Sequence, residues 1–172
     1  GIDPQYTSTG VDAVMSAAME HARSVFAGLG AALRTVKFPD PQDVIRDWGP
    51  QCAVETAAAH AATYPSQAAA YGPGLGGFIA MGREVKALHL QEVWKRRRRF
   101  AGRVAALFET IDLLLIPAQP MASPTVAQMA TLGQDPNAFE VLVKFTAPFN
   151  TTGSPTITFP AGFTVNSTTT GS

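Results

Sequence analysis

Leu113-Leu114-Leu115-Ile116, closed by Pro117, is the stretch of this 172-residue sequence that decides the predicted fold. The run is continuously apolar and too short for a helix, which favours a strand buried on both faces. A long helix is predicted just before it, from about Arg83 to Thr110, because apolar residues recur there at helical spacing. A helix followed by a buried strand is typical of an α/β sheet. The sequence therefore predicts the α/β class.

Other segments are predicted to complete this architecture. Residues 32–38 alternate apolar and polar side chains, as a half-buried strand does, and Thr156–Phe159 and Phe163–Val165 are further strand candidates. Helices are predicted over about residues 10–28, 42–48, 50–63 and 139–149. The stretch 64–78 is rich in Gly and Pro, so it is predicted to be a loop with one short helical turn.

Composition excludes several classes of protein. Hydrophobic residues make up 46% of the chain, which excludes an intrinsically disordered protein. The 13 basic and 13 acidic side chains cancel, so no strong attraction to nucleic acid is expected. No apolar run approaches the roughly 20 residues of a membrane span. The single Cys52 excludes an internal disulfide framework, and with no secretion signal a cytoplasmic protein is expected.

No catalytic pair stands out in the sequence. Cys52 and His60 are eight positions apart on one predicted helix, about 12 Å along its axis, which is too far for a hydrogen bond. The other two histidines, His21 and His89, lie on separate predicted helices without metal-ligand spacing. Ser154 lies in Thr-Gly-Ser-Pro, which is not the Gly-x-Ser-x-Gly nucleophile elbow. The sequence therefore predicts no catalytic residue, no metal and no other cofactor in this chain.

Lys95–Arg99 is the strongest run of charge. Consecutive residues of a helix are rotated by about 100°, so these five side chains cannot form one flat patch. A solvated helix face is therefore predicted. Arg97 is the exception, because it falls in register with the apolar face and is expected to be buried and paired. A non-enzymatic binding module that uses this helix remains an alternative, and a steep salt dependence of nucleic-acid binding would support it.

Four stretches resemble the C-terminal half of the amidase signature family, which are serine hydrolases that cleave amide carbon–nitrogen bonds. They are Gly1–Asp3, Phe26–Pro39, Phe108–Pro117 and Pro148–Gly162. The last stretch is the most specific, since it fits Asn-x-x-Gly-x-Pro, an apolar strand and Pro-x-Gly. The resemblance implies a mixed sheet flanked by helices. It also implies that residues 1–172 are the C-terminal part of one larger amidase domain, with the N-terminal half of the enzyme as partner.

The resemblance implies a function for the intact protein. The family hydrolyses amides by acyl transfer, with a Ser nucleophile, a second Ser in a cis peptide bond and a Lys base. No Gly-Ser-Ser string occurs here, and the four lysines match no family position. The catalytic residues are therefore expected upstream of the matched region, and this chain alone is expected to be inactive toward its small-molecule amide substrate. A homo-oligomer is left open.

The resemblance also implies which residues contact substrate. Val143 and Ala147 are expected to line the pocket, because they lie four apart on a predicted helix and the stretch from Phe145 onward carries no charge. Asn150, Gly153 and Pro155 of the motif are expected to be structural. The amidase subunit of a tRNA-dependent amidotransferase is the alternative within the family. Such subunits carry Asp at the position of Val143, so the apolar residue favours a plain amidase.

Overall fold

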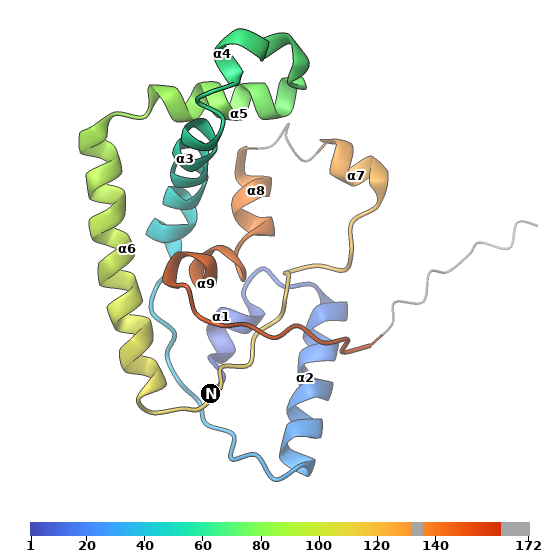
Figure 1. Ribbon diagram of the computed structural model, residues 1–172. Coiled ribbons are helices and arrows are strands. Elements are labelled where there is room, and N and C mark those ends of the chain that lie inside the picture. The colour runs from blue at the N-terminus through green and yellow to red at the C-terminus, as the bar shows by residue number, and fades with distance from the viewer. Residues whose placement is uncertain (132–135, 163–172) are drawn as a thin grey trace, which may run out of the picture.

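The computed structural model describes residues 1–131 and 136–162, and helices dominate this part of the chain (Figure 1). Two long helices, α2 and α3, are followed by the short α4 and η1, then by α5 and the longest helix α6, and then by three short helices. The bounds are α1 Pro4–Ser8, α2 Ala13–Gly28, α3 Gln42–Ala59, α4 Tyr64–Gln67, the 3-10 turn η1 Ala68–Ala70, α5 Pro73–Glu84, α6 Ala87–Phe108, α7 Val126–Thr131, α8 Pro136–Leu142 and α9 Ala147–Thr152.

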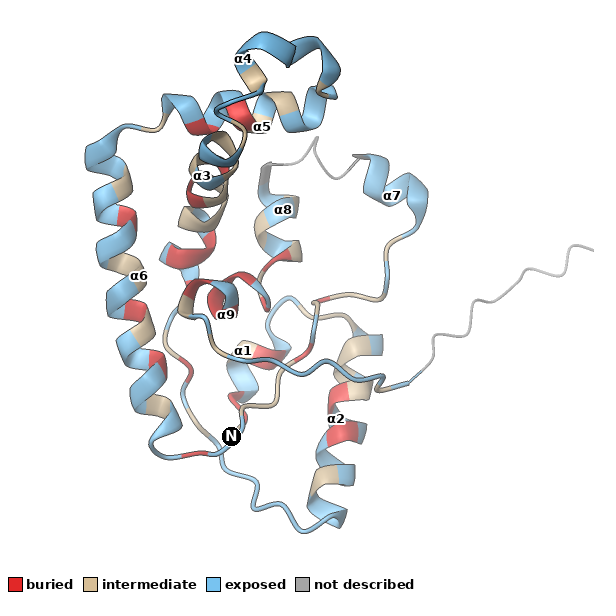
Figure 2. Cartoon of the chain, in the orientation of Figure 1, coloured by how far each residue is buried: buried red, intermediate tan, exposed pale blue. Residues whose placement is uncertain are grey.

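Helix α3 organises the packing, because α5, α6 and α9 all contact it. The crossing of α5 over α3 is very close: a Cβ added to Gly82 would lie 2.0 Å from the carbonyl oxygen of Ala53. Figure 2 shows buried residues on the sides of α3, α6 and α9 that face one another. The main hydrophobic cluster draws on these helices and on the segment before α3. Its buried members are Phe38, Val44, Phe100, Val104 and Phe149.

The predicted α/β class with a mixed sheet is wrong for the described residues. Residues 1–131 and 136–162 contain no strand and no sheet, and one isolated parallel bridge joins Ile2 to Thr35. Leu113–Ile116 is an extended segment in which the N–H of Leu115 donates to the carbonyl of Gly1 at 3.0 Å. The side chain of Leu113 is 68% exposed, so this run is not buried on both faces.

These segments do not form strands because they lack a ladder of backbone hydrogen bonds to a neighbouring segment. A strand is stable when a neighbour satisfies its N–H and C=O groups along several residues. In the described chain, residues 1–2 bond to residues 34–36 and to Leu115 over one or two positions only, and Thr156–Phe159 is extended and exposed. β-Propensity depends strongly on such neighbours, so apolar runs alone did not produce strands. The third candidate, Phe163–Val165, lies outside the described residues.

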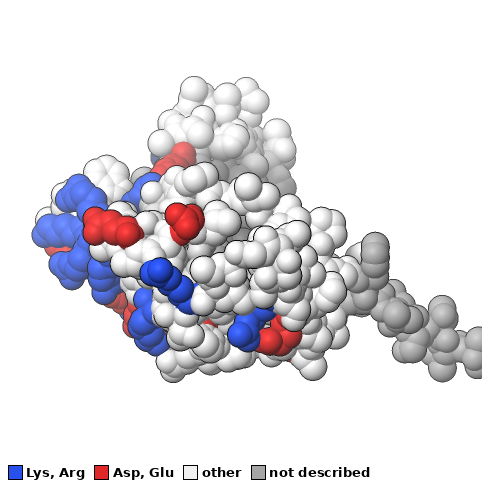
Figure 3. All heavy atoms as spheres, turned by 90° about the horizontal axis from the view of Figure 1, so that it is seen from below, with Lys and Arg blue, Asp and Glu red and all other residues white. Residues whose placement is uncertain are grey.

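The charge run on α6 is partly neutralised. Lys95 pairs with Glu92 at 2.6 Å, and Arg96 pairs with Asp47 through Nε at 2.6 Å and Nη2 at 2.9 Å. Seen from below, the Lys and Arg side chains gather most densely on the α6 side of the molecule, with acidic side chains between them (Figure 3). Within the described chain, no helix combines the length and hydrophobicity that crossing a membrane requires.

Candidate functional site

The candidate site is the segment from Val143 to Pro155, which joins α8 to the extended stretch after α9. A turn follows α8, in which the carbonyl of Val143 accepts the N–H of Thr146 at 3.1 Å and of Ala147 at 2.9 Å. Gly153 ends α9 in the left-handed region, with φ of 71°. Its N–H donates to the carbonyl of Phe149 at 2.9 Å. Because side chains other than Gly are strained at this φ, the motif needs its glycine to stop the helix.

Val143 and Ala147 lie together, but the predicted helix over residues 139–149 is wrong, because α8 ends at Leu142 and α9 begins at Ala147. Both are buried, and they form one cluster with Ile45 of α3, against which Trp48 packs. In the described chain, their side chains therefore pack against α3. Their predicted contact with a substrate stays a prediction.

The other motif residues lie at the surface. Asn150 is exposed, and its backbone N–H donates to the carbonyl of Thr146 at 3.0 Å within α9. Pro155 is exposed in the extended stretch that follows. Between them, the hydroxyls of Thr152 and Ser154 lie 2.7 Å apart, and the N–H of Ser154 donates to the Thr152 hydroxyl at 3.3 Å. These bonds stiffen the turn after α9, while the predicted structural role of the Asn150 side chain stays a prediction.

Helix α9 is fixed from two sides. The ring of Phe149 stacks on Phe38 with 5.6 Å between centroids. Nε of Arg97 donates to the carbonyl of Thr151 at 2.7 Å, and Arg97 is half-buried. Arg97 is thus paired, as predicted, but it is half-buried and is no exception, because Arg96 is also half-buried and paired. The partner of Arg97 is a free carbonyl at the end of α9, which a guanidinium satisfies well.

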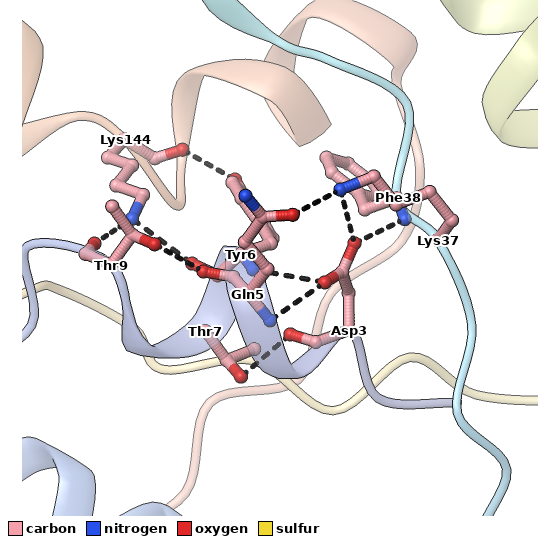
Figure 4. A network of polar contacts seen from close by, with 8 residues as sticks. All are labelled: Asp3, Gln5, Tyr6, Thr7, Thr9, Lys37, Phe38 and Lys144. Carbon is pink, nitrogen blue, oxygen red and sulfur yellow. Dashed lines mark hydrogen bonds and ion pairs between the residues drawn. The ribbon is translucent and has the colours of Figure 1, made fainter.

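A polar network joins the site to the start of the chain (Figure 4). The Tyr6 hydroxyl donates to the carbonyl of Lys144 at 2.7 Å, and the Lys144 ammonium donates back to the carbonyls of Tyr6 and Thr9. Burial lowers the pKa of Lys144. Burial, and then the nearby carboxylate of Asp3, raise the pKa of the Tyr6 hydroxyl. The sequence showed no sign of this link between α1 and residue 144, since the two are 138 positions apart.

No nucleophile and base come together in the described residues. Burial, followed by the charge of Glu55, raises the pKa of the Cys52 thiol, which keeps it protonated. His60 instead lies with Nδ1 3.1 Å from the hydroxyl of Tyr71. Groups of three or more His, Cys, Asp or Glu placed to hold a metal ion are also absent from this part of the chain. Among the described residues, the contacts of Cys52 and His60 therefore do not join them as a nucleophile and a base.

Comparison with known proteins places the chain in a family. The model of the Amidase family matches residues 1–171, and the chain belongs to this family. The resemblance inferred from the four sequence stretches is thus confirmed.

Curated relatives come from mycobacteria. The chain is similar to a protein of Mycobacterium bovis named "Putative amidase AmiD", with 44% identity over 116 residues. This match covers 67% of the chain and 24% of the relative. Proteins of the same name from Mycobacterium tuberculosis match with the same identity and coverage. The matched stretch is thus about a quarter of the length of these relatives. No solved structure matches the chain significantly.

Proposed function

We propose that this chain is part of an amidase that hydrolyses the carbon–nitrogen bond of small-molecule amides. The observation that carries the proposal is the family match, which runs over residues 1–171. The mycobacterial relatives that bear an amidase name support it. The quarter of their length that is matched supports the proposal that this chain supplies one portion of a larger amidase domain.

In this proposal the reaction is acyl transfer, and its catalytic residues lie outside this chain. A Lys base draws a proton through a Ser in a cis peptide bond, and the nucleophilic Ser attacks the amide carbonyl. The contacts of Lys144 argue against its acting as this Lys base. Its ammonium is held by the carbonyls of Tyr6 and Thr9 and lies 4.7 Å from the centre of the Phe145 ring. A lysine with these contacts fastens α1 to the turn after α8.

The proposed contribution of this chain is core packing and one wall of the substrate pocket. Val143 and Ala147 are the proposed contact residues, at the start of a segment that carries no charge from Phe145 onward. Apolar surface with few polar groups is usual for a small-molecule pocket. The amidotransferase alternative is disfavoured because the position at which such subunits carry Asp is the apolar Val143 in this chain.

The activity can be tested with a chimera. In the Mycobacterium tuberculosis relative, the matched stretch is replaced by the corresponding residues of this chain, and ammonia release from a primary amide is measured. We expect the chimera and the parent relative to release ammonia, and the purified 172-residue chain to release none. Turnover by the chain alone would contradict the absence of catalytic residues. A folded but inactive chimera beside an active parent would contradict the amidase proposal.

The pocket wall needs a separate comparison in the same chimera. Val143→Thr preserves the side-chain shape and replaces one methyl group with a hydroxyl, so it should change the ratio of kcat/KM between an aliphatic and an aromatic amide. Val126→Thr is the matched control, because Val126 is 89% exposed on α7. If Val143→Thr lowers stability but leaves the kcat/KM ratio at the control value, Val143 is a core residue only.

A further inference from the structure

A small hollow of about 70 Å³ lies between the start of α3 and the middle of α6. Three arginines of α6, Arg96, Arg99 and Arg103, line one side of it, and Phe100 between them is almost completely buried. Asp40 and Asp43 line the other side. The hollow is far too small for a nucleoside or a peptide side chain with its backbone, but it has room for a group of a few heavy atoms.

The spacing of the three arginines concentrates their charge. Positions 96, 99 and 103 follow one another by three and four residues, which places them on one face of the helix. Like charges at these spacings destabilise a helix. Carboxylates that offset this repulsion within α6 are scarce, since Glu92 already pairs with Lys95.

The carboxylates around the hollow contact partners other than Arg99 and Arg103, although Asp40 keeps its negative charge. Asp47 holds Arg96 through two hydrogen bonds. Asp43 pairs with Arg46 on the same helix, and Asp40 accepts the N–H of Gln42 at 3.1 Å.

Two guanidiniums remain available in the hollow. Among the described residues, Arg99 makes no ion pair or hydrogen bond, and Arg103 contacts only the face of the Phe100 ring, 5.7 Å from its centre. Each guanidinium presents five N–H donors. The two cations are therefore adjacent and exposed, and neither forms an ion pair with a carboxylate of the described residues.

We propose that this hollow binds a phosphate-class dianion through Arg99 and Arg103. One dianion neutralises both free guanidiniums, and its oxygens match the planar fork of donors on each of them. A single carboxylate neutralises only one. Arg96 adds a third positive charge at the hollow while it keeps its ion pair with Asp47. The ligand is either free phosphate or the phosphate group of a larger molecule that lies outside the hollow.

Titration with inorganic phosphate tests the site. The Nε–H signals of the arginines in the ¹⁵N-labelled chain are followed at constant ionic strength, with sodium chloride as the reference salt. We expect saturable shifts, and Arg99→Gln and Arg103→Gln should each weaken binding about tenfold, as loss of a charge-assisted contact does. Arg98→Gln is the matched control, because Arg98 is an exposed neighbour outside the hollow, and it should weaken binding less than about twofold.

Two further titrations complete the experiment, one with an Asp43 variant and one with a phosphate ester. Asp43→Asn removes a carboxylate from the rim, so it should tighten phosphate binding. Phenyl phosphate is titrated beside inorganic phosphate: tighter binding of phenyl phosphate indicates a phosphate ester as ligand, and equal or weaker binding indicates the free ion. Equal weakening by all three arginine variants, or no saturable shift beyond that of chloride, would overturn the proposal. Circular dichroism of each variant confirms that the helices are retained.

Discussion

The carboxylate of Asp3 accepts the backbone N–H of Phe38 at 2.7 Å and so joins two residues 35 positions apart. Asp3 is only 2% exposed, and its other oxygen accepts the N–H groups of Gln5 and Tyr6 at 3.0 Å, where it caps α1. The ring of Phe38 in turn stacks on Tyr6 at 4.6 Å between centroids. One buried carboxylate thus fixes both the start of α1 and the chain that leads into α3.

Replacing Asp3 should therefore be costly. Asp3→Asn keeps the size of the side chain but turns an acceptor oxygen into a donor that faces N–H groups. We expect the free energy of unfolding to fall by about 2–3 kcal/mol, the usual range for losing bonds to a charged group. Glu20→Gln serves as the control, because the exposed pair of Glu20 with Arg23 should contribute less than about 1 kcal/mol. Equal effects of the two substitutions in urea unfolding would show that Asp3 is not a structural centre.

The close crossing of α5 and α3 gives a prediction for Gly82. A methyl group at this position would meet the backbone of Ala53, so Gly82→Ala should separate the two helices and destabilise the chain by more than about 2 kcal/mol. Gly102→Ala is the matched control, since Gly102 is exposed in α6 with open space around its Cα. That substitution should raise stability by about 0.5–1 kcal/mol through helix propensity. A neutral Gly82→Ala variant in thermal unfolding would contradict the packing of α5 on α3.

The Tyr6 hydroxyl should make stability depend on pH in the alkaline range. Its pKa is raised in the folded chain, whereas in the unfolded chain it ionises near its ordinary value of about 10. Above that pH the unfolded chain binds fewer protons than the folded chain, so this contribution to stability falls as pH rises. Tyr6→Phe should remove this part of the slope of unfolding free energy between pH 9 and 11, although it lowers stability at neutral pH. Equal slopes for wild type and Tyr6→Phe would refute the assignment.

Charge at position 143 should disrupt the core. Val143→Asp would place a carboxylate against Ile45 and Ala147, and we expect a loss of more than about 3 kcal/mol or no cooperative unfolding at all. Val126→Asp changes an 89% exposed valine in the same way and should alter stability by less than about 0.5 kcal/mol. Urea unfolding of both variants measures the difference. If both are equally stable, position 143 is open to water and the cluster with Ile45 does not form in solution.

The helices followed from the sequence where their apolar spacing was regular. Helices α2 and α6 were predicted close to their observed positions for this reason. Helix α5 was predicted as a loop because four glycines and a proline fall within residues 72–77. Pro73 instead stands at its first turn, where proline is favoured, and contact with α3 stabilises the glycine-rich turns. Pro50 was expected to separate two helices, yet α3 runs through it.

The predicted strands and most of the site's contacts depend on distant residues, which is why the sequence could not define them. An apolar run such as Leu113–Ile116 becomes a strand only beside a partner, and spacing along the chain does not reveal the partner. The partial burial and pairing of Arg97 were predictable, because its register with the apolar face of α6 is a local property. The hydrogen bonds of Lys144 to α1 were not predictable, because they join two segments that are far apart in the sequence and have no common sequence pattern.

The link between Tyr6 and Lys144 has a consequence for the order in which the chain folds. Helices α3 and α5 are near neighbours along the chain, so they can meet after closing a short loop. The Tyr6–Lys144 bond closes a loop of 138 positions, which carries a larger entropic cost and is gained only after the intervening helices have assembled. The turn that begins the candidate site would thus reach its final position late, when α1 docks. Until then, the apolar side chains of Phe145, Ala147 and Phe149, which are buried in the folded chain, would remain exposed to other chains.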